Sequence, residues 1–164
     1  MQDEEFQSRL NAAVLAAFDA LLMEIGRETP YAIALFTCES AMSIGFAATT
    51  EEHLAIREVD VDDAAYYRWS TAEWRNEGWR ADLFESFTRS PHAETGDFDT
   101  HFDGILEAMQ MALANRRSKR ALQLEDVTLF ATVTDDDVAE DVENRTAKVL
   151  NPPSVAERFH RRYD

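Results

Sequence analysis

The sequence predicts an α+β fold in which two long helices pack on a small mixed or antiparallel sheet, with a short helix at the C-terminus. Two long segments carry apolar residues at helical spacing, whereas three short apolar segments have the length and composition of strands. The chain has 164 residues, of which 45% are hydrophobic, so a domain of ordinary size can bury a core. We therefore expect residues 1–164 to form a single domain.

The opening segment, residues 6–25, is the clearest helix. Its apolar residues recur at intervals of three and four, which places them on one helix face. They are Phe6, Leu10, Ala13, Val14, Ala17, Phe18, Leu21, Leu22 and Ile25. Gly26 offers a C-terminal stop for this helix, and Pro30 follows soon after.

Two strands are expected next, over residues 31–38 and 42–48. Both segments are short and apolar, and Pro30 before the first and Gly45 within the second favour strands over helices. A third strand is expected over residues 127–133, which are rich in β-branched side chains and apolar on both faces. That pattern is typical of a central strand covered by helices.

The second long helix is expected over residues 97–117, after a polar loop at residues 90–96. A short terminal helix is expected over residues 154–163, after the chain is broken at residues 151–153 by two prolines. Further helix starts are indicated by pairs of residues with capping-box spacing. These pairs are Thr49 with Glu52, Ser70 with Glu73, and Asp137 with Glu140.

Four stretches of the chain have a familiar order and spacing. They are residues 31–37 (YAIALFT), 49–54 (TTEEHL), 66–74 (YYRWSTAEW) and 150–159 (LNPPSVAERF). In these stretches the chain resembles the bacterial domain-of-unknown-function 4303 family over nearly its whole length. The resemblance implies a small soluble protein of about this size and carries over no catalytic residue. By analogy, it suggests a link to the immunity proteins of bacterial toxin systems.

The composition limits the classes of function. Asp and Glu number 32 against 16 Lys and Arg, which gives a formal net charge of -16. This balance argues against binding to nucleic acid or to anionic membranes, because affinity for phosphate depends on clustered cations. The single cysteine, the acidic N-terminus and the lack of a long apolar run favour the cytoplasm.

The densest acidic group follows the third strand and is open to two interpretations. It lacks the ligand pattern of a calcium loop. It is either a solvated helix start or a recognition surface for a basic protein, which a strong negative charge attracts. The candidate partner-binding residues of this group are Asp135, Asp136, Asp137, Glu140 and Asp141, with Glu143 close by.

The aromatic stretch at residues 66–87 contains every tryptophan of the chain, Trp69, Trp74 and Trp79. Their five-residue spacing would fan the rings around one straight helix, so some are expected to face the core and others to line a groove. Core packing is the ordinary role of such rings, but tryptophan with interleaved arginine is also typical of binding hot spots. If they are exposed, the three tryptophans are expected to anchor a partner.

A second acidic group includes histidine and is compared with metal sites. Side chains four residues apart on a helix share a face, so a metal-dependent hydrolase using residues 92–103 is the alternative function. The group lacks the HExxH pattern, however, and carboxylates at a helix start are usually partners of the helix dipole. We therefore expect no metal and no cofactor. The members of the group are His92, Asp97, Asp99, His101 and Asp103.

The remaining nucleophile is Cys38, which ends an apolar strand and is expected to be buried and structural, with Glu39 raising its pKa. No phosphate-binding loop or nucleophile elbow is present. The sequence therefore predicts a non-enzymatic acidic binding protein, in its most concrete version an immunity-type inhibitor of a basic partner such as a bacterial toxin. A further alternative is an accessory domain whose charge only maintains solubility.

Overall fold

The computed structural model describes residues 4–57, 59–88, 97–119 and 123–164. The strands are β1 Pro30–Cys38, β2 Gly45–Thr50 and β3 Thr128–Thr134. The helices are α1 Glu4–Ile25, α2 Glu51–Ala55, α3 Ala64–Trp69, α4 Phe98–Lys119, α5 Ala139–Leu150 and α6 Pro153–His160. Single 3-10 turns, η1 Val61–Asp63, η2 Thr71–Glu73, η3 Ala81–Leu83 and η4 Glu85–Phe87, lie between α2 and α4. The predicted α+β class, the two long helices and the short C-terminal helix are confirmed.

The sheet is mixed and has the strand order β2-β1-β3. β1 runs antiparallel to β2 and parallel to β3, so that Leu35 lies between Phe46 and Ala131. The prediction that the third strand is central is therefore wrong, because β1 holds that place. β3 is apolar on both faces for another reason: helices cover both of its faces although it lies at the end of the strand order.

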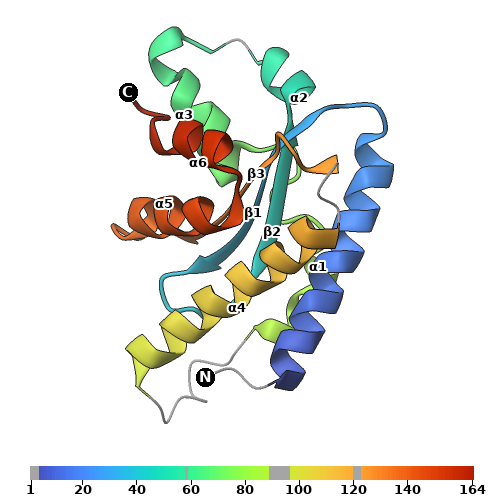
Figure 1. Ribbon diagram of the computed structural model, residues 1–164, viewed down its shortest axis with the longest axis vertical. Helices are drawn as coiled ribbons and strands as arrows, with labels where there is room; N and C mark the ends of the chain where they lie inside the picture. The colour runs from blue at the N-terminus through green and yellow to red at the C-terminus, as the bar shows by residue number, and fades with distance from the viewer. Residues whose placement is uncertain (1–3, 58, 89–96, 120–122) are drawn as a thin grey trace.

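Helices cover the sheet on both sides (Figure 1). Alternate side chains of a strand point to opposite faces. Ile33 and Leu35 therefore belong to the larger core cluster with α1 and α4, while Ala32 and Ala34 belong to a smaller cluster with α3 and α6. The predicted apolar face of the first helix is confirmed, since eight of its nine residues are buried and the ninth, Leu22, packs partly buried against the core.

The outer edge of β3 is covered by side chains of α5 and of the residue that follows it. The Oγ1 of Thr146 accepts a hydrogen bond from the backbone N–H of Ala131 at 3.0 Å. The side-chain amide of Asn151 bonds both the N–H and the C=O of Leu129, at 2.8 and 2.7 Å. An uncovered strand edge offers unpaired backbone groups to other chains. α5 and Asn151 therefore cover this edge of the sheet. The same bonds fix the position of α5, and so of its first turn, relative to β3.

The predicted helix starts differ from the structure by small shifts. Pairing with Pro30 extends β2 to Thr50, so Thr50 rather than Thr49 caps α2 by accepting from the N–H of His53. The carboxylate of Glu52 accepts from the backbone N–H and the hydroxyl of Thr29, before β1. Neither Ser70 nor Asp137 provides a side-chain cap hydrogen bond. The loop predicted over residues 90–96 lies outside the described residues.

Candidate functional site

The acidic surface is formed where β3 ends and α5 begins. We use this name for Asp135, Asp136, Asp137, Glu140 and Asp141. Asp135 takes a left-handed backbone conformation with φ at +58°, which turns the chain away from the sheet. The carboxylate of Asp136 then accepts from the N–H of Val138 at 2.9 Å, and this turn leads into α5. Four of the five acidic side chains are exposed and that of Asp136 is half-buried.

Among the residues that the structure describes, no ion pair joins the acidic surface to a Lys or Arg side chain. Val138 lies inside the surface and is 41% exposed, so an apolar side chain stands among the carboxylates. The positive end of the α5 dipole stabilises Glu140 and Asp141 in the first helical turn. The surface is thus charged and, apart from the half-buried Asp136, exposed.

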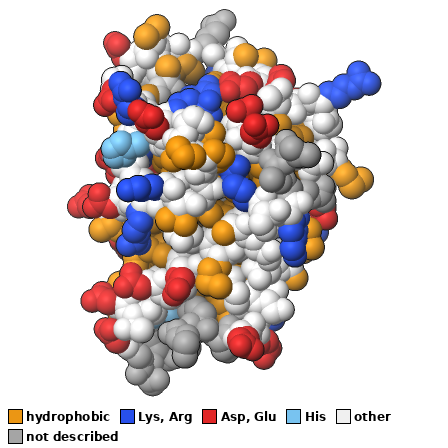
Figure 2. All heavy atoms as spheres, in the orientation of Figure 1, with side chains coloured by type: hydrophobic (Ala, Val, Ile, Leu, Met, Phe, Trp, Pro, Cys, Tyr) orange, Lys and Arg blue, Asp and Glu red, His pale blue; other side chains and the backbone are white. Residues whose placement is uncertain are grey.

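Other carboxylates lie at the same end of the sheet. β1 and β3 are parallel, so Cys38 and Thr134 finish side by side, and the exposed Glu39 follows directly. A ring nitrogen of His101 lies 3.1 Å from the carbonyl oxygen of Ala41, which brings the start of α4 against the β1–β2 connection. Figure 2 shows red side chains gathered at the lower left, over the end of the molecule where α4 begins.

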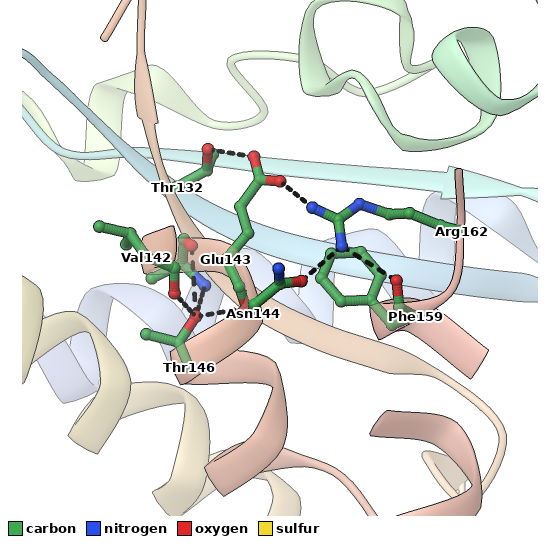
Figure 3. A network of polar contacts seen from close by, with 8 residues as sticks. Thr132, Val142, Glu143, Asn144, Thr146, Phe159 and Arg162 are labelled. Carbon is green, nitrogen blue, oxygen red and sulfur yellow. Dashed lines mark hydrogen bonds and ion pairs between the residues drawn. The ribbon is translucent and has the colours of Figure 1, made fainter. Parts of the chain in front are cut away.

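Glu143 does not belong to the accessible acidic group, although the sequence places it there. Its carboxylate points inward, where it accepts from the Oγ1 of Thr132 at 2.6 Å and from the guanidinium of Arg162 at 2.9 Å (Figure 3). The Arg162 side chain is 0% exposed and that of Glu143 is 15% exposed. Burial raises the pKa of Glu143, while the bonds from Thr132 and Arg162 offset part of that shift.

The guanidinium of Arg162 joins three elements. Its Nη1 donates to the Oδ1 of Asn144 at 2.6 Å and to the carbonyl oxygen of Phe159 at 2.9 Å, and its Cζ lies 4.0 Å from the centre of the Phe159 ring. Together with the bond to Glu143, these contacts hold the C-terminal segment against α5 and, through Thr132, against β3 (Figure 3). Nothing in the local sequence pattern around Glu143 indicates this network.

The tryptophans lie mainly in the core, which corrects their possible role as exposed anchors. Trp69 is 6% and Trp74 4% exposed. The Trp69 ring packs edge-on against Phe159, and that of Trp74 against Phe130. Trp79 is half-buried, and its indole N–H donates to the carbonyl oxygen of Ala17 on α1. Because short helices and 3-10 turns replace one straight helix, each ring turns toward the core separately.

The arginines interleaved with the tryptophans bind carboxylates of the same chain. Arg68 forms an ion pair with Glu51, Arg75 with Glu28, and Arg80 with Asp82. These pairs occupy the three arginines, although the ring of Tyr66 is 53% exposed. The condition attached to the tryptophan prediction is not met for Trp69 and Trp74, which are buried, and Trp79 is half-buried.

Cys38 is half-buried at the end of β1. Burial acts to raise the pKa of its thiol, but hydrogen bonds from the Ser40 and Ser43 side chains and from backbone groups of residues 40 and 42 outweigh it and lower the pKa to about 7. The direction is opposite to the one expected from Glu39. No bond to an imidazole is recorded for this thiol among the described residues, so the thiol has no general base there.

The candidate metal group is only partly described, because His92 lies outside the described residues. The carboxylate of Asp97 accepts from the N–H and the hydroxyl of Thr100 at the start of α4, and His101 faces a backbone carbonyl. Within the described part of the chain, no three His, Cys, Asp or Glu side chains gather as metal ligands. The hydrolase alternative gains no support from these residues.

A hollow between α5 and α6 has no counterpart in the sequence analysis. It has a volume of about 440 Å³, and its walls include Asn144 and Lys148 of α5 and Glu157 and His160 of α6. The spacings of four and of three residues place each pair on one face of its helix. The spacing can be read from the sequence, but the sequence does not indicate that these two helix faces lie against each other.

Comparison with known families identifies the family of this chain. The sequence model of a family described as a domain of unknown function, DUF4303, matches residues 10–152. The chain belongs to this family. The match confirms the resemblance, although it ends inside the stretch at residues 150–159. No curated protein and no solved structure matches the chain. In the described part of this DUF4303 protein, no helix is long and apolar enough to cross a membrane.

Proposed function

We propose that this DUF4303 protein is a non-enzymatic binding protein of the bacterial cytoplasm that uses its acidic surface to hold a basic protein partner. The most concrete version is an immunity-type inhibitor that blocks a toxin. The observation that carries the proposal is the acidic surface itself, in which five carboxylates, four of them exposed, flank the exposed Val138 in the chain and form no ion pair with described residues.

Carboxylates without a cationic neighbour gain the most from a basic partner. An exposed carboxylate that is already paired has less to gain from a cationic partner than one that is not. Five neighbouring carboxylates, none of them in an ion pair with a described residue, on a chain of net charge -16, produce a field that accelerates association with a basic protein. Val138 adds an apolar contact that can exclude water once the partner is bound.

A pull-down from the lysate of the native host, at low and at moderate salt, tests the proposal. The bait carries either the wild-type surface or the changes Asp137→Asn, Glu140→Gln and Asp141→Asn, which leave the turn residues Asp135 and Asp136 intact. We expect one basic protein in stoichiometric amount on the wild-type bait, weakened by salt and strongly reduced on the variant.

A matched control separates the surface from net charge. Asp60, Asp62 and Asp63 are exposed around η1, and their change to Asn removes the same number of negative charges elsewhere. This control is expected to retain the partner. Equal loss on both variants would assign the effect to overall charge. A blank with the wild-type bait at low salt would favour the accessory domain that only maintains solubility.

A further inference from the structure

The hollow between α5 and α6 stands apart from the acidic surface and has its own chemistry. Its volume of about 440 Å³ lies within the range of sites for small organic molecules. Pro153 and Ala156 give it apolar walls. We propose that this hollow binds a small organic anion, one that carries a carboxylate or phosphate group on an apolar body.

The side-chain amide of Asn144 is held in one orientation by Arg162. Its Oδ1 accepts from the buried Arg162 guanidinium, which Glu143 and Phe159 hold in place. The amide nitrogen is thereby left as a donor, and it carries no hydrogen bond to any other described residue, as Figure 3 shows. A side-chain amide whose oxygen is committed in this way presents only N–H groups to the hollow.

The other polar groups of the hollow are mostly donors. The ammonium of Lys148 carries only donors, and the ring of His160 offers an N–H in either protonation state. Asn151 also lines the hollow, but both ends of its amide are committed to Leu129, so it forms a closed wall. Glu157 is the one carboxylate among the described residues of the lining. The donor set favours an oxyanion over a cation.

The C-terminal segment from the middle of α5 onward differs in charge from the rest of the chain. Residues 143–164 contain five Lys and Arg and three Asp and Glu, in a chain with twice as many acidic as basic residues. Two of these cations already have carboxylate partners, since Arg162 pairs with Glu143 and Arg161 with Asp164. Figure 2 shows blue and pale-blue side chains, with red ones among them, on the left of the molecule, over the region of α5 and α6. The segment is therefore weakly positive within a chain of net charge -16. An anion is repelled less at the hollow than at the acidic surface.

The test is a titration followed in ¹H–¹⁵N correlation spectra at constant ionic strength. The probes are phenyl phosphate, benzoate and, as the neutral match, phenol. We expect saturable shifts of the Asn144 side-chain amide and of the backbone amides at Lys148 and His160 with one or both anions, and none with phenol. The two anions distinguish a phosphate ligand from a carboxylate ligand. No saturable shift at millimolar anion, or equal shifts with phenol, overturns the proposal.

Two variants on α5 locate the site. Lys148→Met is expected to weaken anion binding about five- to tenfold, as for the loss of one charge-assisted hydrogen bond. Arg145→Met removes the same charge from the same helix but lines a separate hollow between α4 and α5, so binding should change by less than about twofold. Both side chains are exposed, so both variants are expected to fold. If both variants weakened anion binding equally, the effect would come from the overall charge of the protein, and the proposed site would be wrong.

Discussion

Glu140 and Glu143 lie one helical turn apart on α5 and meet opposite surroundings. Glu140 is exposed on the acidic surface, whereas Glu143 is buried between Thr132 and Arg162. The difference is made by the C-terminal segment, which folds back over α5 and brings Arg162 with it. Residues with the same chemistry and nearly the same position in the sequence therefore differ in their surroundings: Glu140 faces solvent, and Glu143 ties α5 to β3 and to the C-terminal segment.

The largest effect is expected from breaking the buried pair. Arg162→Met leaves the Glu143 carboxylate buried without its cation, which should lower the free energy of unfolding by about 3–5 kcal/mol. Arg161→Met is the matched control, because the Arg161 side chain is 65% exposed and, among the described residues, forms its ion pair with Asp164 alone. It should change stability by less than about 0.5 kcal/mol. Urea denaturation measures the free energy of unfolding of both variants. Similar decreases in the two would show that the Glu143–Arg162 pair contributes no more to stability than an exposed pair.

The next effect concerns the edge of the sheet. Thr146→Val keeps the shape of the side chain but leaves the buried N–H of Ala131 without a partner, at a cost of about 1–3 kcal/mol. Thr146→Ser keeps the hydroxyl and loses one buried methyl group, so it should destabilise the protein less. Thermal unfolding compares the two variants. A greater loss in the Ser variant would assign the role of Thr146 to packing instead of hydrogen bonding.

The smallest expected effect is a pH dependence of the free energy of unfolding, which comes from the buried Glu143 of α5. Because the pKa of Glu143 is raised above its ordinary value of 4.5, the folded state holds this proton more firmly than the unfolded state. The contribution of Glu143 to stability is therefore fully present below pH 4.5 and is lost as the pH rises through the raised pKa.

Denaturation of the wild type and of Glu143→Gln across this pH range isolates that contribution. The stability difference, wild type minus variant, should fall with rising pH. A difference that rises with pH would mean that Arg162 outweighs burial and that the pKa of Glu143 is lowered. Thr132→Val sharpens the test, since it removes a hydrogen bond that stabilises the charged carboxylate and should extend the fall to higher pH.

The sequence by itself determined the class of the fold, the two long helices and the strands. Helical periodicity marked the buried face of α1 because burial against a sheet requires one apolar face, and eight of its nine residues are buried. Strand boundaries and caps were less well determined, since pairing of Thr50 with Pro30 depends on a neighbouring strand. The carboxylates that begin α5 are exposed in the structure, as expected for a charged helix start.

Only the tertiary structure decided which of the notable residues are accessible. The spacing of Trp69 and Trp74 is compatible with either core or surface, and the rings are buried because short turns direct each of them toward the sheet. Likewise, Glu143 became part of the interior through Arg162, which lies 19 residues later in the chain. A local sequence pattern shows which side chains are charged or apolar. Whether a side chain is buried depends on contacts with segments distant in sequence, which form only when the chain folds.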